Sequence, residues 1–227
     1  MYFPYGDKEI TYLRDKDKLL GEVIDKIGYI ERETDPDLFS SVVHHIVGQQ
    51  ISSKAQATIW QRLRDTLGEI NAQTISSKEV PELQALGMSF RKAEYIKEFA
   101  DKVQGGEFDL QKVEQMSDAD AIEALSSLRG IGVWTAEMIL LFCLKRPDVF
   151  SFDDLAIQRG LRMLYHHRKV DRNLFEKYRR RFHPYCSVAS LYLWAVASGE
   201  LPDMKDYAPK KPKKSKKDSK KRSAQDL

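Results

Sequence analysis

The sequence predicts an all-α fold, and two observations lead to this fold class. Apolar residues recur at the three- and four-residue spacing of amphipathic helices along most of the chain. No segment shows a convincing period-two alternation of apolar and polar residues, which is the pattern of a half-buried strand. With 227 residues, the chain is long enough to bury a real core in one globular unit or in two small lobes that share a cleft.

The first half of the chain contains four predicted helices. Asp35 and Pro36 supply an N-cap and a proline at the first helical position, and the helix continues through residue 47. A second helix ends at Gly68. A short helix over residues 76–86 follows, and Ser89 then caps a longer helix that a pair of glycines ends.

The second half contains five more predicted helices. Ser117 caps the first of them, with Asp120 three residues on in a weak capping box. The others cover residues 133–144, 154–165, 171–182 and 187–197. The last of these is apolar almost all round, so we expect it to be buried.

The formal net charge of +3 is unevenly distributed along the chain. Residues 209–227 carry nine lysines or arginines and two aspartates, a net charge of +7, so the remaining chain has a charge of −4. Binding of any polyanion by the folded body therefore needs local placement of cations rather than bulk charge. The Lys-, Ser- and Pro-rich tail, residues 206–227, is predicted to be disordered because it cannot bury apolar surface. This tail is either a solubilising end or a nonspecific phosphate-binding arm.

Several classes of protein are excluded by composition. The two cysteines, Cys143 and Cys186, lie far apart and make neither a disulfide framework nor a zinc site. Residues 1–7 lack the basic and apolar regions of a signal peptide. The longest apolar stretch, residues 138–144, is too short to span a bilayer. We therefore expect a cytoplasmic protein without a membrane partner.

Two glycines separated by one residue, Gly130 and Gly132, interrupt two predicted helices. Such a pair indicates a tight turn or the close approach of another chain. The helix that follows begins with unpaired main-chain amides, which together with the positive helix end favour an anion. The segment is either a phosphate-binding turn or a simple loop between two core helices.

Two adjacent carboxylates, Asp153 and Asp154, follow an apolar segment and precede a helix. An aspartate before a helix is a preferred N-cap, and the pattern taken alone favours that structural role. A carboxylate at this place is also chemically suited to stabilise positive charge on a reacting group.

The segment of residues 128–136 resembles the hairpin of the helix-hairpin-helix DNA glycosylase superfamily, with Arg129 where proline is common. The resemblance covers about residues 36–202 and implies two helical lobes, a helix-hairpin-helix motif and a cleft between the lobes. It implies that main-chain amides of the hairpin bind the DNA backbone, at Gly130, Ile131, Gly132, Val133 and Thr135. It also implies a monovalent cation, Na⁺ or K⁺, held by the main-chain carbonyls of Ser126, Leu128 and Ile131.

The resemblance assigns the catalytic role to Asp154, with Asp153 as the cap of the following helix. Cleavage of an N-glycosidic bond builds positive charge on the sugar, which a fixed carboxylate stabilises. The same carboxylate can orient or activate the attacking water. The resemblance therefore predicts an N-glycosyl hydrolase acting in base excision repair of DNA damage, on a base flipped out of the duplex.

Trp134 takes the position at which strand-cleaving members of the superfamily carry a lysine nucleophile. An indole cannot form a Schiff base, so we predict a monofunctional enzyme without strand cleavage. Tryptophan here resembles the alkylpurine (3-methyladenine) branch, because a methylated purine is cationic and an indole face attracts cations. The predicted pocket residues are Trp134, Met138, Trp194 and Tyr192, although core packing explains Trp194 equally well.

Residues 48–55 resemble the turn that supplies the wedge replacing a flipped base. The predicted DNA contacts here are Gln49, Gln50, Ile51 and Ser52, with Gln50 and Ile51 as wedge candidates. His44 and His45 precede this turn without other ligands at metal-binding spacing. We therefore expect no metal site here and favour surface or core histidines over catalytic ones, with contact to the base pocket as the less favoured alternative.

These features predict one lobe from residues 1–49 plus 141–205 and another from residues 50–140. The four-cysteine iron–sulfur cluster of the endonuclease III-like branch is absent from the sequence. We expect no required cofactor, and the hairpin cation would have a structural role. The expected partner is double-stranded DNA with a damaged base, bound by a monomer that is nucleoid-associated if bacterial. Two alternatives remain open: a glycosylase for an oxidised, deaminated or mismatched base, and a non-catalytic DNA-binding module.

Overall fold

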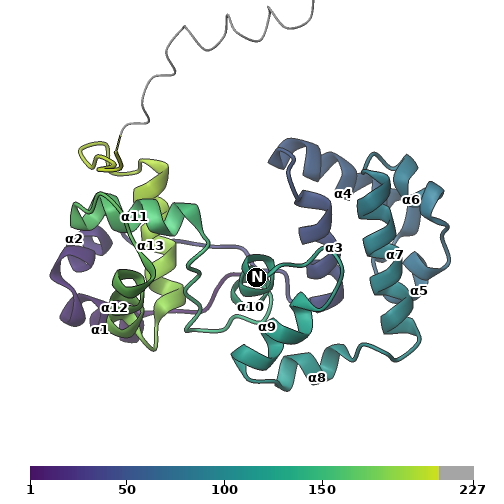
Figure 1. The fold of residues 1–227 in the computed structure, drawn as a ribbon, viewed down its shortest axis with the longest axis horizontal. Coiled ribbons are helices and arrows are strands. Elements are labelled where there is room, and N and C mark those ends of the chain that lie inside the picture. The colour runs from purple at the N-terminus through teal and green to yellow at the C-terminus, as the bar shows by residue number, and fades with distance from the viewer. Residues whose placement is uncertain (210–227) are drawn as a thin grey trace, which may run out of the picture.

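The computed structural model describes residues 1–209, which form thirteen helices and no strand (Figure 1). One isolated bridge joins Tyr2 and Glu33. The all-α prediction is therefore confirmed for these residues. None of the helices in residues 1–209 combines the length and apolar composition needed to cross a membrane.

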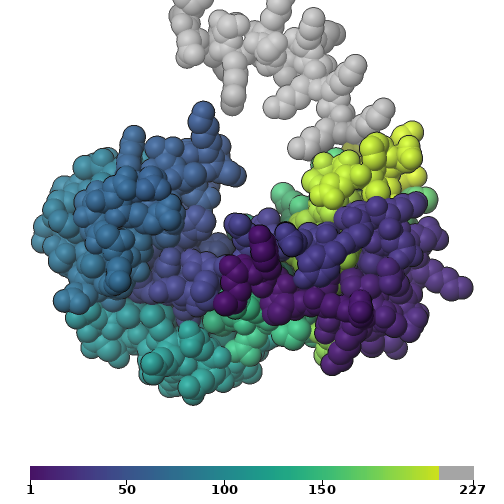
Figure 2. All heavy atoms as spheres, turned by 180° about the vertical axis from the view of Figure 1, so that it is seen from behind, coloured from purple at the N-terminus to yellow at the C-terminus, as the bar shows by residue number. Residues whose placement is uncertain are grey.

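The helices form two groups that lie side by side, with one helix between them (Figure 1). The group on the left consists of α1 (Asp7–Lys16), α2 (Lys18–Ile27), α11 (Leu155–Tyr165), α12 (Arg172–Phe182) and α13 (Cys186–Ser198). The group on the right consists of α3 (Leu38–Gly48), α4 (Ser53–Leu67), α5 (Ala72–Ser76), α6 (Val80–Ala85), α7 (Phe90–Gln104), α8 (Leu110–Gln115) and α9 (Asp118–Ser126). The central helix is α10 (Val133–Phe142), which packs against α9 and α3. Figure 2 shows the two groups from behind, with a hollow between their upper parts.

The predicted lobe boundary after residue 49 is wrong. Helix α3 packs against α4, α7 and α10 rather than with the N- and C-terminal helices. The Phe39 ring stacks on Phe99 of α7 with centroids 4.9 Å apart, which buries α3 in the right-hand lobe. The chain therefore crosses between the lobes before Leu38, through the segment that follows α2.

The tail also begins later than predicted. The Asp206 carboxylate accepts hydrogen bonds from Nε and Nη2 of Arg162, each at 2.8 Å. The Tyr207 ring lies against His166, with centroids 4.6 Å apart. These contacts hold residues 206 and 207 on the left-hand lobe, and the predicted disorder of residues 210–227 lies outside the described residues.

The N-terminal helices α1 and α2 were not predicted, although Asp17 between them is a clear cap. The Asp17 carboxylate accepts from the Leu20 amide at 3.0 Å and pairs with Arg181 of α12 at 2.6 Å. Asp17 is only 4% exposed, so this buried pair connects the junction of α1 and α2 to α12. The partner residue Arg181 lies far from Asp17 in the sequence, so no local pattern indicates the pair.

Other helix boundaries follow from local hydrogen bonds. Ser89 and Ser117 cap α7 and α9, as predicted. The cap of α3 is Asp37 rather than Asp35, because the Asp37 carboxylate accepts from the Ser40 amide at 2.8 Å. The predicted helix over residues 76–86 is instead the two short helices α5 and α6, since a new cap at Glu79 begins α6.

Helix α13 is the buried centre of the left-hand lobe, as its apolar sequence predicted. Most of its side chains are less than 9% exposed, and its main neighbour is α11. Gly160 of α11 faces the main chain of Leu193, so these two helices approach closely. This packing brings the start of α11 and the side chain of Trp194 to one site.

Candidate active site

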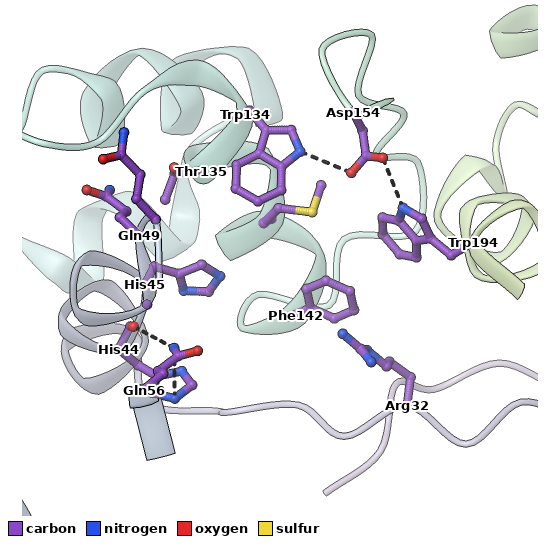
Figure 3. A pocket seen from close by; sticks show the side chains of 13 residues that line it. Arg32, His44, His45, Gln49, Gln56, Trp134, Thr135, Phe142, Asp154 and Trp194 are labelled. Atoms are coloured by element: carbon purple, nitrogen blue, oxygen red, sulfur yellow. Dashed lines mark hydrogen bonds between the residues drawn. The ribbon is translucent and has the colours of Figure 1, made fainter. Parts of the chain in front are cut away.

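A pocket of about 520 Å³ opens between the two lobes. It is formed by the end of α3, the turn that follows it, one face of α10 and the starts of α4 and α11 (Figure 3). The residues that line it are Arg32, His44, His45, Gly48, Gln49, Gln50, Gln56, Trp134, Thr135, Met138, Phe142, Asp154 and Trp194.

The Asp154 carboxylate accepts four hydrogen bonds at the edge of this pocket. Its Oδ1 atom accepts from the amides of Ala156 (2.9 Å) and Ile157 (2.8 Å) and caps α11. Oδ1 also accepts from the indole Nε1 of Trp194 at 3.2 Å, and Oδ2 accepts from Nε1 of Trp134 at 3.0 Å (Figure 3). Four donors leave the carboxylate little freedom to rotate, which is the preorganisation that electrostatic catalysis needs.

The prediction that Asp153 caps α11 is wrong, because Asp154 itself is the cap. The cap and the functional carboxylate are therefore one residue rather than alternatives. The helix amides bind Oδ1 and hold Oδ2 toward Trp134. Asp154 is 6% exposed, and this small exposed surface lines the pocket.

The walls of the pocket are largely aromatic. Trp134 is 44% exposed and is not a core residue, whereas Met138 is 4% exposed and lies one helical turn further into the pocket. The Trp194 ring stacks on Phe142 with centroids 5.6 Å apart. The structure thus places three of the predicted pocket residues around one cavity.

The predicted pocket position of Tyr192 is wrong. Its side chain is completely buried, and its hydroxyl donates to the Gly28 carbonyl at 3.0 Å. Tyr192 precedes Trp194 by two residues, which corresponds to about 200° around a helix. The two side chains therefore leave opposite faces of α13, and only Trp194 reaches the pocket.

The hairpin lies next to this pocket and lines a second hollow of about 380 Å³. Gly130 has a φ of +88°. A Cβ atom at Gly130 would overlap the ring of Tyr95, so glycine is required both for the turn and for the packing. Gly132 begins α10 without a side-chain cap, and a Cβ there would point into open space. Unpaired amides at an open helix N-terminus suit a phosphate group.

The two hollows form one continuous surface, because Gln49 and Gln50 line both of them. The Gln49 side-chain amide donates to the Gly130 carbonyl at 2.6 Å and joins the turn after α3 to the hairpin. A carboxylate held at an aromatic pocket and an amide-rich turn for phosphate thus face the same groove.

Residues 43–184 match the HhH-GPD superfamily of base excision DNA repair proteins. The chain belongs to this superfamily. It is 31% identical over 181 residues to DNA-3-methyladenine glycosylase 1 of Schizosaccharomyces pombe, with 76% of this chain and 78% of that relative covered. The predictions of the family and of a glycosylase enzyme are therefore confirmed.

Two solved structures extend the comparison. A DNA-3-methyladenine glycosidase from Bacillus halodurans has 33% identity and a TM-score of 0.79, with 89% of this chain and 95% of that one covered. The S. pombe 3-methyladenine DNA glycosylase in complex with abasic DNA has 26% identity and a TM-score of 0.74, with 86% and 98% covered. The HhH-GPD fold thus accounts for most of the described chain.

The hairpin of this HhH-GPD protein presents main chain rather than side chains to the groove. Ile131 is 5% exposed and belongs to the core, and Val133 is 51% exposed at the first position of α10. Thr135 is buried and faces the base pocket instead of the hairpin surface. Of the predicted hairpin contacts, Gly130, Ile131 and Gly132 line the hollow itself.

The turn after α3 projects toward the same groove. Gln50 is exposed with a left-handed φ of 57°, and Ile51 is 37% exposed. Ser52 caps α4 by accepting from the Ala55 amide at 3.3 Å. Lys92 of α7 holds this turn in place. Its Nζ donates to the Val47 carbonyl at 2.8 Å and to the Gln49 carbonyl at 2.5 Å.

We expect Lys92→Met to weaken DNA binding more than the loss of one positive charge explains. The substitution keeps the length of the side chain and removes both hydrogen bonds that hold the turn. Hydrogen bonds to charged groups contribute about 1.5–3 kcal/mol each, so we expect thermal stability to fall as well. The matched control is Lys97→Met on the same helix, where the ammonium pairs with Asp101 at 2.6 Å and with no other side chain of residues 1–209. Equal affinities of the two variants across a salt titration would contradict a bracing role for Lys92.

Several pocket residues were not predicted. Trp134, Met138 and Phe142 lie at four-residue intervals on one face of α10. Because Trp134 and Met138 were predicted pocket residues, the same spacing would have predicted Phe142. By the same spacing, His45 shares a helix face with Gln49, and its position in the pocket is the less favoured of the two alternatives that the sequence offered. A residue far from all of these, Arg32, reaches the pocket from the segment between the lobes, and no local pattern indicates this.

The monovalent cation predicted at Ser126, Leu128 and Ile131 stays a prediction. The Leu128 carbonyl accepts from the Ile131 amide at 3.1 Å, as a tight turn requires, and keeps a second lone pair. Residues 1–209 contain no cluster of three or more histidine, cysteine or acidic side chains able to hold a metal ion.

Proposed function

We propose that this HhH-GPD protein flips an alkylated purine of the 3-methyladenine or 7-methylguanine type out of duplex DNA and hydrolyses its N-glycosidic bond. The observation that carries the proposal is the Asp154 carboxylate, which two pocket indoles and two helix amides hold at the edge of an aromatic cavity. The relatives named as 3-methyladenine glycosylases support the same activity.

The pocket chemistry suits a base that carries a positive charge. A purine methylated at N3 or N7 is a cation, and the faces of Trp134 and Trp194 attract cations. Such a base leaves without prior protonation, so the site needs no general acid. When the C1′–N bond breaks, its electron pair leaves with the base and the sugar becomes positively charged.

Asp154 stabilises this sugar cation, because its ionised oxygens lie at the pocket edge and cannot reorient. A water oxygen then bonds to C1′ and releases a proton, which the carboxylate can accept or direct to solvent. The products are a free base and an abasic site. The hairpin amides bind the neighbouring phosphates and keep the sugar in register during these steps.

The test is to measure which free bases are released from randomly methylated DNA. We expect methylated purines to be released at rates well above spontaneous depurination, and DNA with an oxidised or mismatched base to be left intact. Clearance of a neutral lesion with methylated DNA untouched would contradict the alkylpurine specificity. Binding to DNA without release of any base would favour the non-catalytic alternative.

We expect no covalent adduct when the enzyme is treated with borohydride during turnover. Borohydride traps the Schiff base that an amine nucleophile forms with the sugar. The hairpin position of that amine is Trp134, whose indole donates to Asp154 and cannot attack. A DNA-bound protein band on a denaturing gel would show that another amine cleaves the strand.

The proposed partner is duplex DNA with a damaged base, bound by a monomer. Exposed apolar side chains follow pocket residues in the sequence of both lobes: Leu155, 79% exposed, follows Asp154, and Ile51, 37% exposed, follows Gln50. Such side chains can replace the stacking that a flipped base loses. A cytoplasmic location, with the nucleoid as the site of action in a bacterium, belongs to the same proposal.

A further inference from the structure

The base pocket has a polar edge as well as its aromatic walls. Arg32 and His45 enter it from two different segments, and both side chains point into the cavity (Figure 3). Neither takes part in holding Asp154, and neither belongs to the hairpin. Their hydrogen-bonding properties therefore bear on which base the pocket accepts.

His45 presents a hydrogen-bond acceptor to the pocket. Its Nδ1 lies 2.8 Å from the Ser41 carbonyl oxygen and must carry the proton, since a carbonyl only accepts. Burial lowers the pKa of His45 below its ordinary value, so the ring is neutral at neutral pH. Nε2 is then a lone-pair acceptor, and no other group among residues 1–209 donates to it.

Arg32 presents a donor that always carries a charge. Its guanidinium lies over the Phe142 ring, 4.7 Å from the centroid. Arg32 is an exposed residue, and none of the ion pairs or side-chain hydrogen bonds within residues 1–209 involves its side chain, although Glu31 and Glu33 flank it in the sequence. The main chain is fixed, because the Phe3 amide donates to the Arg32 carbonyl at 2.8 Å. The five donors of this side chain are thus left for a ligand.

An unpaired cation in this pocket discriminates between the two kinds of methylated purine. The outer edge of 7-methylguanine carries the carbonyl oxygen O6 beside the N1–H donor, which complements a guanidinium and a neutral imidazole. The corresponding edge of 3-methyladenine carries an amino group and the ring nitrogen N1. The amino group cannot accept from Arg32, and N1 is a weak acceptor because it belongs to the cationic ring. Arg32 therefore repels both cationic bases, but 7-methylguanine offsets the repulsion by accepting a hydrogen bond at O6, whereas 3-methyladenine has no comparable acceptor.

We propose that Arg32, with His45, selects 6-oxopurines and makes 7-methylguanine the preferred base over 3-methyladenine. This inference rests on the proposed function and names the substrate class of the same pocket. Arg32 acts as a specificity residue that donates to O6, while His45 accepts from N1–H. The aromatic walls and Asp154 serve both bases equally.

The test compares the release of 7-methylguanine and 3-methyladenine from the same methylated DNA under single-turnover conditions. Arg32→Met keeps an apolar side chain on Phe142 and removes the donors and the charge. We expect it to lower the rate of 7-methylguanine release by about tenfold or more, the effect of losing a hydrogen bond to a charged donor. The rate of 3-methyladenine release should stay the same or rise. Arg168→Met, at an exposed position of the left-hand lobe, controls for the loss of one positive charge.

A ratio of the two rates that Arg32→Met leaves unchanged would overturn the inference, and so would a selective loss of 3-methyladenine release. In both cases the wild-type enzyme still releases methylated bases, and the proposed function stands. If the wild-type enzyme releases neither base, the result contradicts the proposed function itself, and with it the inference about Arg32. A thermal unfolding curve like that of the wild type ensures that a lower rate reflects the pocket rather than the fold.

Discussion

Asp154→Asn is expected to reduce the rate of base release from methylated DNA by about 10²–10³-fold, the usual effect of removing one preorganised charge-stabilising group. The amide cannot offset the positive charge of the sugar. It also disturbs the local hydrogen bonds, because its oxygen keeps the Ala156 and Ile157 amides and its NH₂ group then meets the Trp134 indole N–H. Two donors facing each other leave that indole without an acceptor.

The measurement pairs single-turnover base release with binding to DNA that contains an abasic analogue. We expect binding to remain within a few-fold of the wild type, because the hairpin and the turn after α3 are unchanged. Asp153→Asn is the matched control, since it makes the same chemical change one residue earlier at an exposed position outside the pocket. Equal rates of base release for Asp154→Asn and the wild type would remove this carboxylate from the mechanism.

Gly160→Ala is expected to destabilise the fold by about 2 kcal/mol, within the range for overpacking a core. A Cβ at this position would overlap the Leu193 carbonyl oxygen and lie 3.0 Å from its carbonyl carbon. Main-chain atoms of a buried helix cannot move aside as a side chain can, so α13 has to shift away from α11. Alanine recovers up to about 1 kcal/mol of helix propensity, which is too little to offset the overlap.

The check is thermal unfolding of Gly160→Ala beside Gly6→Ala, where a Cβ meets nothing within 4 Å. For a chain of this size, we expect the melting temperature of Gly160→Ala to fall by about 5 °C. The shift should also weaken the 3.2 Å hydrogen bond between Trp194 and Asp154, because the two residues belong to the two helices that separate. An unchanged melting temperature would mean that the α11–α13 interface adapts without cost.

The site has two parts: the Asp154 carboxylate, and the hairpin with the turn after α3. Asp154 is bound to the start of its own helix and to two indoles, so its position depends on α10, α11 and α13 together. The hairpin is bound to the turn after α3 through Gln49 and Gly130. The segments that we propose to bind phosphate and to stabilise the sugar are therefore linked to their neighbours by direct hydrogen bonds.

The sequence alone was sufficient for features that depend on neighbouring residues. The caps Ser89 and Ser117, the glycine hairpin and the helix beginning at Asp154 follow from hydrogen bonds and backbone angles within a few residues. The prediction that Trp134 replaces an amine nucleophile came from the resemblance of residues 128–136 to the superfamily hairpin, and the borohydride experiment tests it. The all-α class likewise followed from apolar spacing, which is a property of each segment by itself.

The tertiary structure decided what depends on the phase and packing of distant segments. Helical phase places Trp194 at the pocket and Tyr192 in the core, and the sequence listed both as candidates. The lobe to which α3 belongs follows from the stacking of Phe39 on Phe99, sixty residues away in the chain. Arg32 lines the pocket from the segment between the lobes, with its guanidinium over the ring of Phe142 in α10. A local pattern cannot encode these contacts, since each one arises when two independently formed elements meet.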